Sequence, residues 1–422
     1  MSTGRTGRSA APCAQDFQLV DGGISALDFD ARAVVRLART RVSLADVSDE
    51  TRAFHRRLPG YEATPLRSCP ELAAALGVGA VWVKVETRRL DLPAFKILGT
   101  FYGIYKLLVQ RSGDEPSWVR IEDLRHWVAR LSPLSLSAAT DGNHGRAVAH
   151  IASLLGLGAT IYVPKGMSRA RVQSIEEEGA TVVVVDGDYD ATVRRSAQDA
   201  SAQCLVVSDT SWPGYLDVPT WVMDGYATVF AEVREELATQ STKKHRDDGT
   251  AAGIDVVMVP AGVGALLGAA LRSLKGSDAS AAPVVVSVEP TSADCVARSL
   301  DAGTIVHVPG PHPSIMVGLN CGTPSEVAWP RIAAALDGAV AIGDGWAVHA
   351  MRDLAACGIV AGETGAASLA GLLALCRASE LAEAKEAFGL GPRSRVLVLC
   401  TEGATDPDRY RQIVGTPPDG AS

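Results

Sequence analysis

The chain has 422 residues, of which 47% are apolar and 21% are charged, with a formal net charge of -8. This length suits two domains or one large α/β unit, and the composition is that of an ordinary globular protein. The acidic balance argues against a nucleic-acid partner, which would require a basic face to neutralise phosphates. No apolar run reaches the roughly 18 residues that a membrane-spanning helix requires, so no membrane partner is expected.

The N-terminal stretch MSTGRTGRSAAPCAQ carries two arginines but no apolar core after them. It is not typical of a secretory signal, and we expect residues 1–40 to form a disordered leader and N-terminal arm. The eight cysteines show no CxxC pair and no metal-ligand spacing, so no metal site is expected. We interpret most of them as small buried apolar residues in a reducing cytoplasm.

From Val81 onward, strand-like runs alternate with helical patterns. The predicted strands are 81–86, 134–140, 159–164, 181–186, 204–209, 255–262, 283–290 and 395–403. The predicted helices between them are 146–156, 169–178, 190–202, 219–238 and 264–274, and the polar stretch 238–253 predicts an exposed loop. Several strands are apolar throughout, as expected when helices cover both faces of a sheet. The alternation indicates parallel sheets, so the predicted fold class is α/β.

Lys96 lies inside the apolar run LPAFKILG. Burial disfavours a charged ammonium and lowers the pKa of a lysine, which makes its amine usable as a base, or as a nucleophile towards an aldehyde. The alternative is a surface lysine whose head group reaches water.

Two strand-to-helix turns near the predicted sheet edges could hold ligands, which collect at the carboxyl ends of parallel strands. The turn ATDGNHG (139–145) either caps its helix or presses backbone against a small ligand. The turn PAGVGAL (260–266) carries successive glycines, whose amides can surround a phosphate at a helix N-terminus. With Gly268 and Glu289, the second turn also approaches a dinucleotide-binding fingerprint, which is a weak signal alone.

Two further polar turns follow predicted strands. Asp209 follows one strand, where it either caps a turn or faces the cleft as an acid. Thr401 and Glu402 follow the last strand and either reach a cofactor edge or form a plain C-terminal turn. A lysine able to form an imine beside a site for one phosphate is what pyridoxal phosphate requires.

The motif AFKILG resembles the lysine motif of fold-type-II pyridoxal-phosphate enzymes, and further segments narrow the resemblance to the diaminopropionate ammonia-lyase family. The similarity runs from about Phe54 to about Gly415. The segments that carry it, in chain order, are RAFHRRLPGYEATPL, ATDGNHGRAVAHIA, DTSWPGYLDVPTWVMDGYATVFAEV, AGVGALLGAAL, VEPTSADC, IMVGLNCGTPS, GETGAAS and TEGATDPDRYRQIVG.

The resemblance assigns roles to individual residues. Lys96 would hold the cofactor through a Schiff base, and Asn143 would hydrogen-bond its ring hydroxyl. Thr401 would approach the pyridine nitrogen, and Asp141 would be a second acid or base. Asp209 would bind or activate the substrate's amino groups. The backbone amides that would bind the phosphate belong to Gly262, Val263, Gly264 and Ala265.

The chemistry that the resemblance implies is α,β-elimination of D- or L-2,3-diaminopropionate to pyruvate and two ammonia through an aminoacrylate. Two proton acceptors, Lys96 and Asp141, would serve the two enantiomers. An alternative reaction with the same cofactor is β-replacement, or elimination from another β-substituted amino acid. A remote alternative is a nicotinamide-dependent oxidoreductase that leaves Lys96 and the GNHG turn unexplained and uses Gly262, Gly264, Gly268 and Glu289.

The family also implies an architecture. Residues 41–99 and 221–422 would form a large cofactor domain, and residues 100–220 a smaller inserted α/β domain that closes over the substrate. A cytoplasmic homodimer is expected.

Three positions along the chain stand out. Asp91 stands where a glycine is common in this family. Cys295 and Cys321 lie in matched segments that we expect to meet near the rim of the active site, where the two thiols could bridge.

Overall fold

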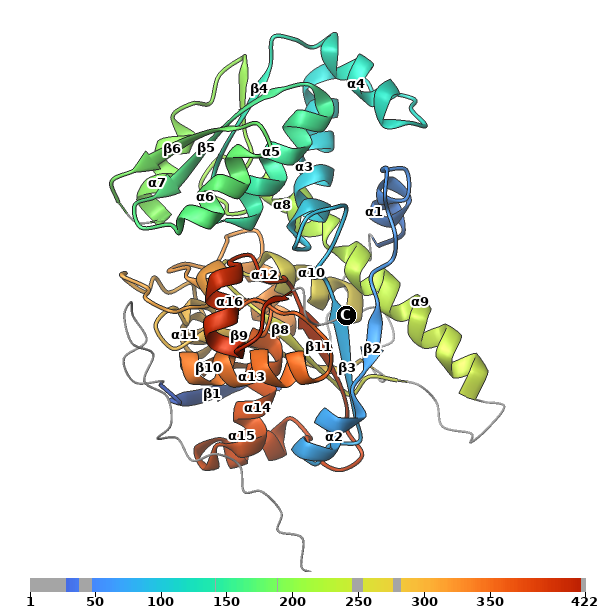
Figure 1. Ribbon diagram of the computed structural model, residues 1–422, viewed down its shortest axis with the longest axis vertical. Helices are drawn as coiled ribbons and strands as arrows, with labels where there is room; N and C mark the ends of the chain where they lie inside the picture. The colour runs from blue at the N-terminus through green and yellow to red at the C-terminus, as the bar shows by residue number, and fades with distance from the viewer. Residues whose placement is uncertain are drawn as a thin grey trace, which may run out of the picture.

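The computed structural model describes residues 28–37, 48–140, 142–187, 189–244, 253–275 and 282–418. Two sheets, each flanked by helices, form the framework of the molecule (Figure 1). The seven-stranded sheet has the order β1-β10-β9-β8-β11-β3-β2. The four-stranded sheet has the order β6-β5-β4-β7.

The strands of the larger sheet are β1 (Ala31–Val35), β2 (Leu66–Ser68), β3 (Ala80–Val85), β8 (Val256–Pro260), β9 (Val284–Pro290), β10 (Gly338–Ile342) and β11 (Arg395–Cys400). The strands of the smaller sheet are β4 (Ser135–Ala139), β5 (Gly158–Pro164), β6 (Thr181–Val185) and β7 (Cys204–Val206). The smaller sheet is wholly parallel. The larger one is parallel except at its edges, where β1 and β2 run antiparallel to β10 and β3. The predicted α/β class with two largely parallel sheets is confirmed.

The helices that precede β9 are α1 (Ser48–His55), α2 (Pro70–Leu76), α3 (Lys96–Ser112), α4 (Ile121–Ala129), α5 (Asn143–Leu155), α6 (Arg169–Glu176), α7 (Tyr189–Ala197), α8 (Asp217–Gly225), α9 (Ala227–Lys244) and α10 (Ala265–Leu274). The later helices are α11 (Cys295–Ala302), α12 (Trp329–Ala335), α13 (Asp344–Ala356), α14 (Ala367–Arg377), α15 (Ala382–Ala387) and α16 (Pro407–Val414). No helix within the described ranges is long and apolar enough to cross a bilayer.

All eight predicted strands are present, but β1, β2 and β10 were not predicted. β2 has only three residues, and β10, with the sequence GAVAI, contains glycine and two alanines, which are depleted in strands. β1 lies inside the predicted N-terminal arm, whose residues 1–27 and 38–40 lie outside the described residues. The strands of the smaller sheet fall between residues 135 and 206, and the predicted domain limits remain a prediction.

The predicted helix 219–238 is wrong in one respect, because two helices, α8 and α9, meet there at Tyr226. α8 packs closely on α3, since a Cβ added to Gly225 would lie 2.7 Å from the Cα of Gly99. Glycines on both helices therefore allow their backbones to touch. α9 continues to Lys244, so the first part of the predicted loop 238–253 is helical, and residues 245–252 lie outside the described residues.

A buried network of charges fixes the segment that leads from β3 to Lys96. Lys84 on β3 lies 2.5 Å from Glu232 of α9, and the Arg89 guanidinium contacts both Glu232 and Glu86 at 2.6–2.9 Å. The side chains of Lys84, Glu86, Arg89 and Glu232 are each about 1% exposed. Because an unpaired buried charge is very costly, these contacts hold the segment in one position.

The same segment contains a left-handed turn at two non-glycine residues. Leu90 has φ 49° and Asp91 has φ 63°. Glycine adopts this conformation without steric cost, and aspartate tolerates it better than branched residues. The backbone at Asp91 thus explains why a glycine is suitable at this position.

Glu289 at the end of β9 is fully buried and points at the start of α11. Its carboxylate accepts hydrogen bonds from the backbone N–H groups of Val296 and Ala297 at 2.7 and 2.8 Å. Burial outweighs these bonds and raises the pKa of Glu289 from 4.5 to about 8. The carboxyl group is therefore structural and lies at the base of a helix.

We predict that Glu289 makes the free energy of unfolding fall as the pH rises from about 5 to 8. The folded state retains a proton over this range that the unfolded state has lost, so the slope from this group approaches about -1.4 kcal/mol per pH unit. Urea unfolding at several pH values should show a smaller negative slope for Glu289→Gln than for the wild type. Equal slopes for the two proteins would contradict the assignment.

Candidate active site

The candidate active site is a pocket between the two sheets, at the carboxyl ends of their strands. Segments that follow β3, β4, β7, β8 and β11 each contribute side chains or backbone to it. The pocket has an empty volume of about 840 Å³, counting space open to solvent. This is enough for a cofactor and a small substrate, and the position is where ligands bind in open α/β sheets.

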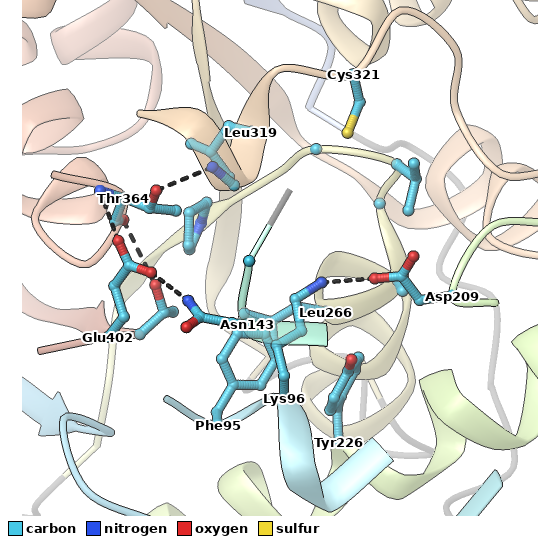
Figure 2. A pocket seen from close by; sticks show the side chains of 18 of the residues that line it. Phe95, Lys96, Asn143, Asp209, Tyr226, Leu266, Leu319, Cys321, Thr364 and Glu402 are labelled. Atoms are coloured by element: carbon cyan, nitrogen blue, oxygen red, sulfur yellow. Dashed lines mark hydrogen bonds and ion pairs between the residues drawn. The ribbon is translucent and has the colours of Figure 1, made fainter. Parts of the chain in front are cut away.

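Lys96 and Asp209 form an ion pair inside this pocket (Figure 2), with Nζ of Lys96 2.6 Å from Oδ2 of Asp209. Lys96 is the first residue of α3, and Asp209 follows β7 of the smaller sheet. The Lys96 side chain is 23% exposed and that of Asp209 is 7% exposed. The apolar neighbours Ile97 and Leu98 are buried in the core, whereas the Lys96 amine meets a carboxylate.

The surroundings of Asp209 favour its anionic form. Burial alone would raise its pKa, but the Lys96 ammonium and the adjacent His144 hold the pKa of Asp209 well below its usual range. The Tyr189 hydroxyl also lies 3.5 Å from Oδ1 of Asp209. The pocket thus contains a fixed negative charge that can bind the amino group of a ligand.

The turn between β8 and α10 forms a cradle of backbone groups, as predicted from the glycines. Gly264 has φ +92° and caps the N-terminus of α10. A Cβ added to Gly262 would lie 3.0 Å from Sγ of Cys321 and 3.1 Å from the carbonyl oxygen of Gly318. The first N–H groups of a helix have no partner within the helix. The turn, with Val263 and Ala265, lines the pocket and can bind a phosphate through these amides.

Three helices begin at this pocket. α3 starts at Lys96, α5 at Asn143 and α10 at Ala265, and all three residues line the cavity. Helix N-termini carry partial positive charge, which attracts anions and disfavours a protonated lysine at the same place. The pocket therefore combines an attraction for phosphate with a lysine whose ammonium depends on Asp209 for compensation.

A second group of polar side chains faces Lys96 from the other side of the pocket. The side-chain amide of Asn143 donates a hydrogen bond to Glu402, which also accepts from the backbone N–H of Thr364 at 3.2 Å. The Thr401 hydroxyl is buried and donates to the carbonyl oxygen of Thr364 at 3.4 Å. Burial raises the pKa of Glu402 even though Arg171 acts in the opposite direction.

Most of the predicted site residues come together in this pocket, but not all can be placed. Lys96, Asn143, Asp209, Thr401 and the turn 262–265 line it, whereas Asp141 lies outside the described residues. Their individual roles remain predictions.

The two cysteines of the matched segments both lie next to the glycine turn. Cys321 lines the pocket, and Sγ of Cys295 is 3.8 Å from the carbonyl oxygen of Gly262. The structure contains no disulfide bond between these two cysteines.

The nicotinamide alternative loses two of its elements. Glu289 caps α11, and a Cβ at Gly268 would lie 2.4 Å from Sδ of Met223, so this glycine serves the packing of α10 on α8. Neither residue is among those that line the pocket.

Sequence reasoning missed several residues that line the pocket. They are Phe95, Arg171, Tyr189, Tyr226, Leu266, Leu319 and Thr364. Phe95 and Leu266 adjoin predicted residues and could have been found from that position. Arg171, Tyr226 and Thr364 reach the pocket only through the packing of distant segments and leave no local signal.

The residues present fit pyridoxal phosphate. The glycine turn would hold the phosphate, Lys96 would supply the amine for a Schiff base, and Asn143 and Thr401 would offer polar groups to the ring. Such a cofactor, when bound, supplies an electron sink for a carbanion at the substrate's Cα.

We predict that Lys96→Ala abolishes the visible imine absorbance of the protein purified with pyridoxal phosphate, because no other amine replaces it at the cofactor. Absorbance spectroscopy of the purified variant checks this. Lys165→Ala is the matched control, since Lys165 is 71% exposed in a surface ion pair and should leave the spectrum unchanged. A Lys96→Ala variant with normal absorbance and full turnover would contradict the assignment.

We predict that Gly264→Ala raises the dissociation constant for pyridoxal phosphate about tenfold or more, because the added Cβ strains the turn that directs the amides. Cofactor titration followed by fluorescence or absorbance measures this. Gly166→Ala is the control, since Gly166 has a similar φ of +100° and no atom within 4 Å of the added Cβ. Equal cofactor affinities for the two variants would refute the phosphate site.

Comparisons with known proteins agree with this site. Residues 57–401 match the family model described as pyridoxal-phosphate dependent enzyme. The diaminopropionate ammonia-lyase of Escherichia coli K12 is 36% identical over 370 residues, which covers 86% of this chain and 90% of that protein. The corresponding enzyme of Salmonella typhimurium is 33% identical over 380 residues, covering 87% and 92%.

Solved structures give the same result. The crystal structure of the E. coli diaminopropionate ammonia-lyase in complex with D-serine superposes with a TM-score of 0.80 at 33% identity, covering 92% of this chain and 97% of that one. The complex of the same enzyme with an aminoacrylate–PLP azomethine intermediate superposes with a TM-score of 0.79. The chain therefore belongs to the family of pyridoxal-phosphate-dependent enzymes of fold type II, within its lyases and dehydratases.

Proposed function

We propose that this protein catalyses the pyridoxal-phosphate-dependent α,β-elimination of 2,3-diaminopropionate, which with one water gives pyruvate and two ammonia. The observation that carries the proposal is the anionic Asp209 carboxylate, 2.6 Å from the Lys96 amine and inside the pocket with the glycine turn. A substrate with two amino groups matches a pocket with a fixed negative charge. The 36% identity with the E. coli diaminopropionate ammonia-lyase supports the same substrate.

The residues have distinct tasks in this proposal. Asp209 binds an amino group of the substrate. This contact replaces the ion pair between Asp209 and Lys96. The Lys96 amine then accepts the proton from Cα, for which it must be neutral. Asp141 is proposed to accept the Cα proton of the enantiomer in which that proton lies on the opposite face. Both the D and the L enantiomer are therefore expected substrates.

A second reaction, β-replacement by an added nucleophile, uses the same cofactor and the same lysine. The two reactions differ in their products, because elimination releases pyruvate without any added nucleophile. The nicotinamide alternative lacks its acidic residue, because Glu289 binds the N-terminus of α11.

We predict that the holoenzyme releases pyruvate and ammonia in a ratio of about one to two from D- and L-2,3-diaminopropionate, by the stoichiometry of the elimination. Assays of both products, run beside serine, threonine and cysteine, check this. A preference for one of these other amino acids, or a need for a second nucleophile, would contradict the proposal.

We also predict that Asp209→Asn lowers kcat/KM for this substrate by at least about tenfold, because the acceptor of the substrate ammonium loses its negative charge. Steady-state kinetics of the holoenzyme measure it. Asp186→Asn removes a carboxylate that is 87% exposed and should leave kcat/KM unchanged. An Asp209→Asn variant as active as Asp186→Asn would contradict the proposed role of Asp209 in substrate binding.

A further inference from the structure

Tyr226 is a buried residue of the pocket whose hydroxyl group has no partner. The side chain is 0% exposed, and its hydroxyl oxygen makes no hydrogen bond with any part of the chain that the structure describes. A buried polar group without a partner is costly, by roughly 1–3 kcal/mol. Such a group in a folded protein calls for an explanation, and function at a ligand site is one.

The ring of Tyr226 is held so that its hydroxyl cannot turn elsewhere. It lies against Gly99 of α3, where an added Cβ would be 2.4 Å from its Cε1, and its centroid is 4.7 Å from that of Phe95. The backbone is fixed at the junction of α8 and α9. Packing of the ring, and no polar contact, therefore sets the direction of the hydroxyl.

The hydroxyl points towards the Lys96–Asp209 ion pair (Figure 2). Tyr226 lines the same cavity as these two residues and is influenced electrostatically by both, though it is hydrogen-bonded to neither. Burial raises the pKa of Tyr226 well above its usual range, so the phenol stays neutral. Its oxygen can accept one hydrogen bond, and its proton can be donated in another.

Tyr226 and Asp209 line one cavity, and the chemistry of their side chains suits a small cationic group. An ammonium carries several N–H donors, of which a carboxylate can accept one and a phenol oxygen another. A substrate hydroxyl would offer a single donor and no charge. We propose that Tyr226 is a substrate-binding residue whose hydroxyl, together with Asp209, binds the second amino group of a diamino acid, an assignment that rests on the proposed function.

The variant Tyr226→Phe tests this proposal through stability and specificity together. Removing an unpartnered buried hydroxyl should leave the thermal unfolding temperature of the protein equal to or above that of the wild type. Tyr105→Phe is the matched control, because Tyr105 is a buried tyrosine of α3 whose hydroxyl donates to Glu115 at 2.9 Å. That variant should unfold at a lower temperature and retain the kinetics of the wild type.

In the Tyr226→Phe holoenzyme, the apparent affinity for 2,3-diaminopropionate should fall roughly 10- to 100-fold, mostly through KM, as expected for loss of a hydrogen bond to a charged group. The affinity for serine, which has a hydroxyl in place of the second amine, should change less than about twofold, and the imine absorbance should be retained. Unchanged affinity for the diamino acid would overturn the proposal. An equal loss for both ligands, or loss of cofactor, would overturn it too, because the hydroxyl would then contact a group common to both complexes.

These outcomes are separate from failure of the proposed function. If the wild type binds 2,3-diaminopropionate without turning it over, the proposed reaction is wrong. The ratio of affinities for the diamino acid and serine, measured by absorbance titration, still decides the role of Tyr226.

Discussion

The contact on which this site depends is the ion pair between Lys96 and Asp209. Each residue follows a strand of a different sheet, and Nζ of Lys96 lies 2.6 Å from Oδ2 of Asp209 in a pocket where their side chains are only 23% and 7% exposed. Neither charge could be left there alone without a large desolvation cost. Because the two charges must pair, the position of the smaller sheet depends on that of the larger one. The pairing also places a base and an anion side by side.

The rest of the fold keeps Lys96 at that place. The network of Lys84, Glu86, Arg89 and Glu232 fixes the segment before it, at the cost of burying four charged groups. Close contact between Gly99 and Gly225 packs α8 against α3. Tyr226, which follows α8 directly, lines the same pocket as Lys96. The glycine turn of α10 completes the pocket from the larger sheet, so one cavity contains the proposed phosphate site, a lysine and a carboxylate.

The sequence predicted those parts of the fold whose cause is local. Apolar runs identified the central strands, because helices cover both of their faces, and the glycines before α10 identified the phosphate turn. The short or alanine-rich strands β2 and β10 were missed, since their pairing is decided by neighbours and not by their own residues. The break between α8 and α9 was also missed, because contact with α3 determines it.

The site residues also divide into those that local sequence indicates and those that only contacts between distant segments bring together. Lys96 was recognised as unusual, but its partner lies 113 residues further along the chain, and no local pattern connects the two. The hydrogen bond from Asn143 to Glu402 joins residues 259 positions apart, and no local pattern predicts it either. Resemblance to a family supplied the residue roles that spacing could not. The unpartnered hydroxyl of Tyr226 emerged only from the three-dimensional packing.

The central claim is that Lys96 holds the cofactor in a pocket whose phosphate site is the glycine turn. Reduction of the holoenzyme with borohydride, followed by proteolysis and mass spectrometry, tests it most directly, since reduction converts an imine into a stable amine. The account predicts a phosphopyridoxyl group on the peptide that contains Lys96 and on no other peptide. A label on a different lysine, or no label on a protein that contains the cofactor, would contradict it.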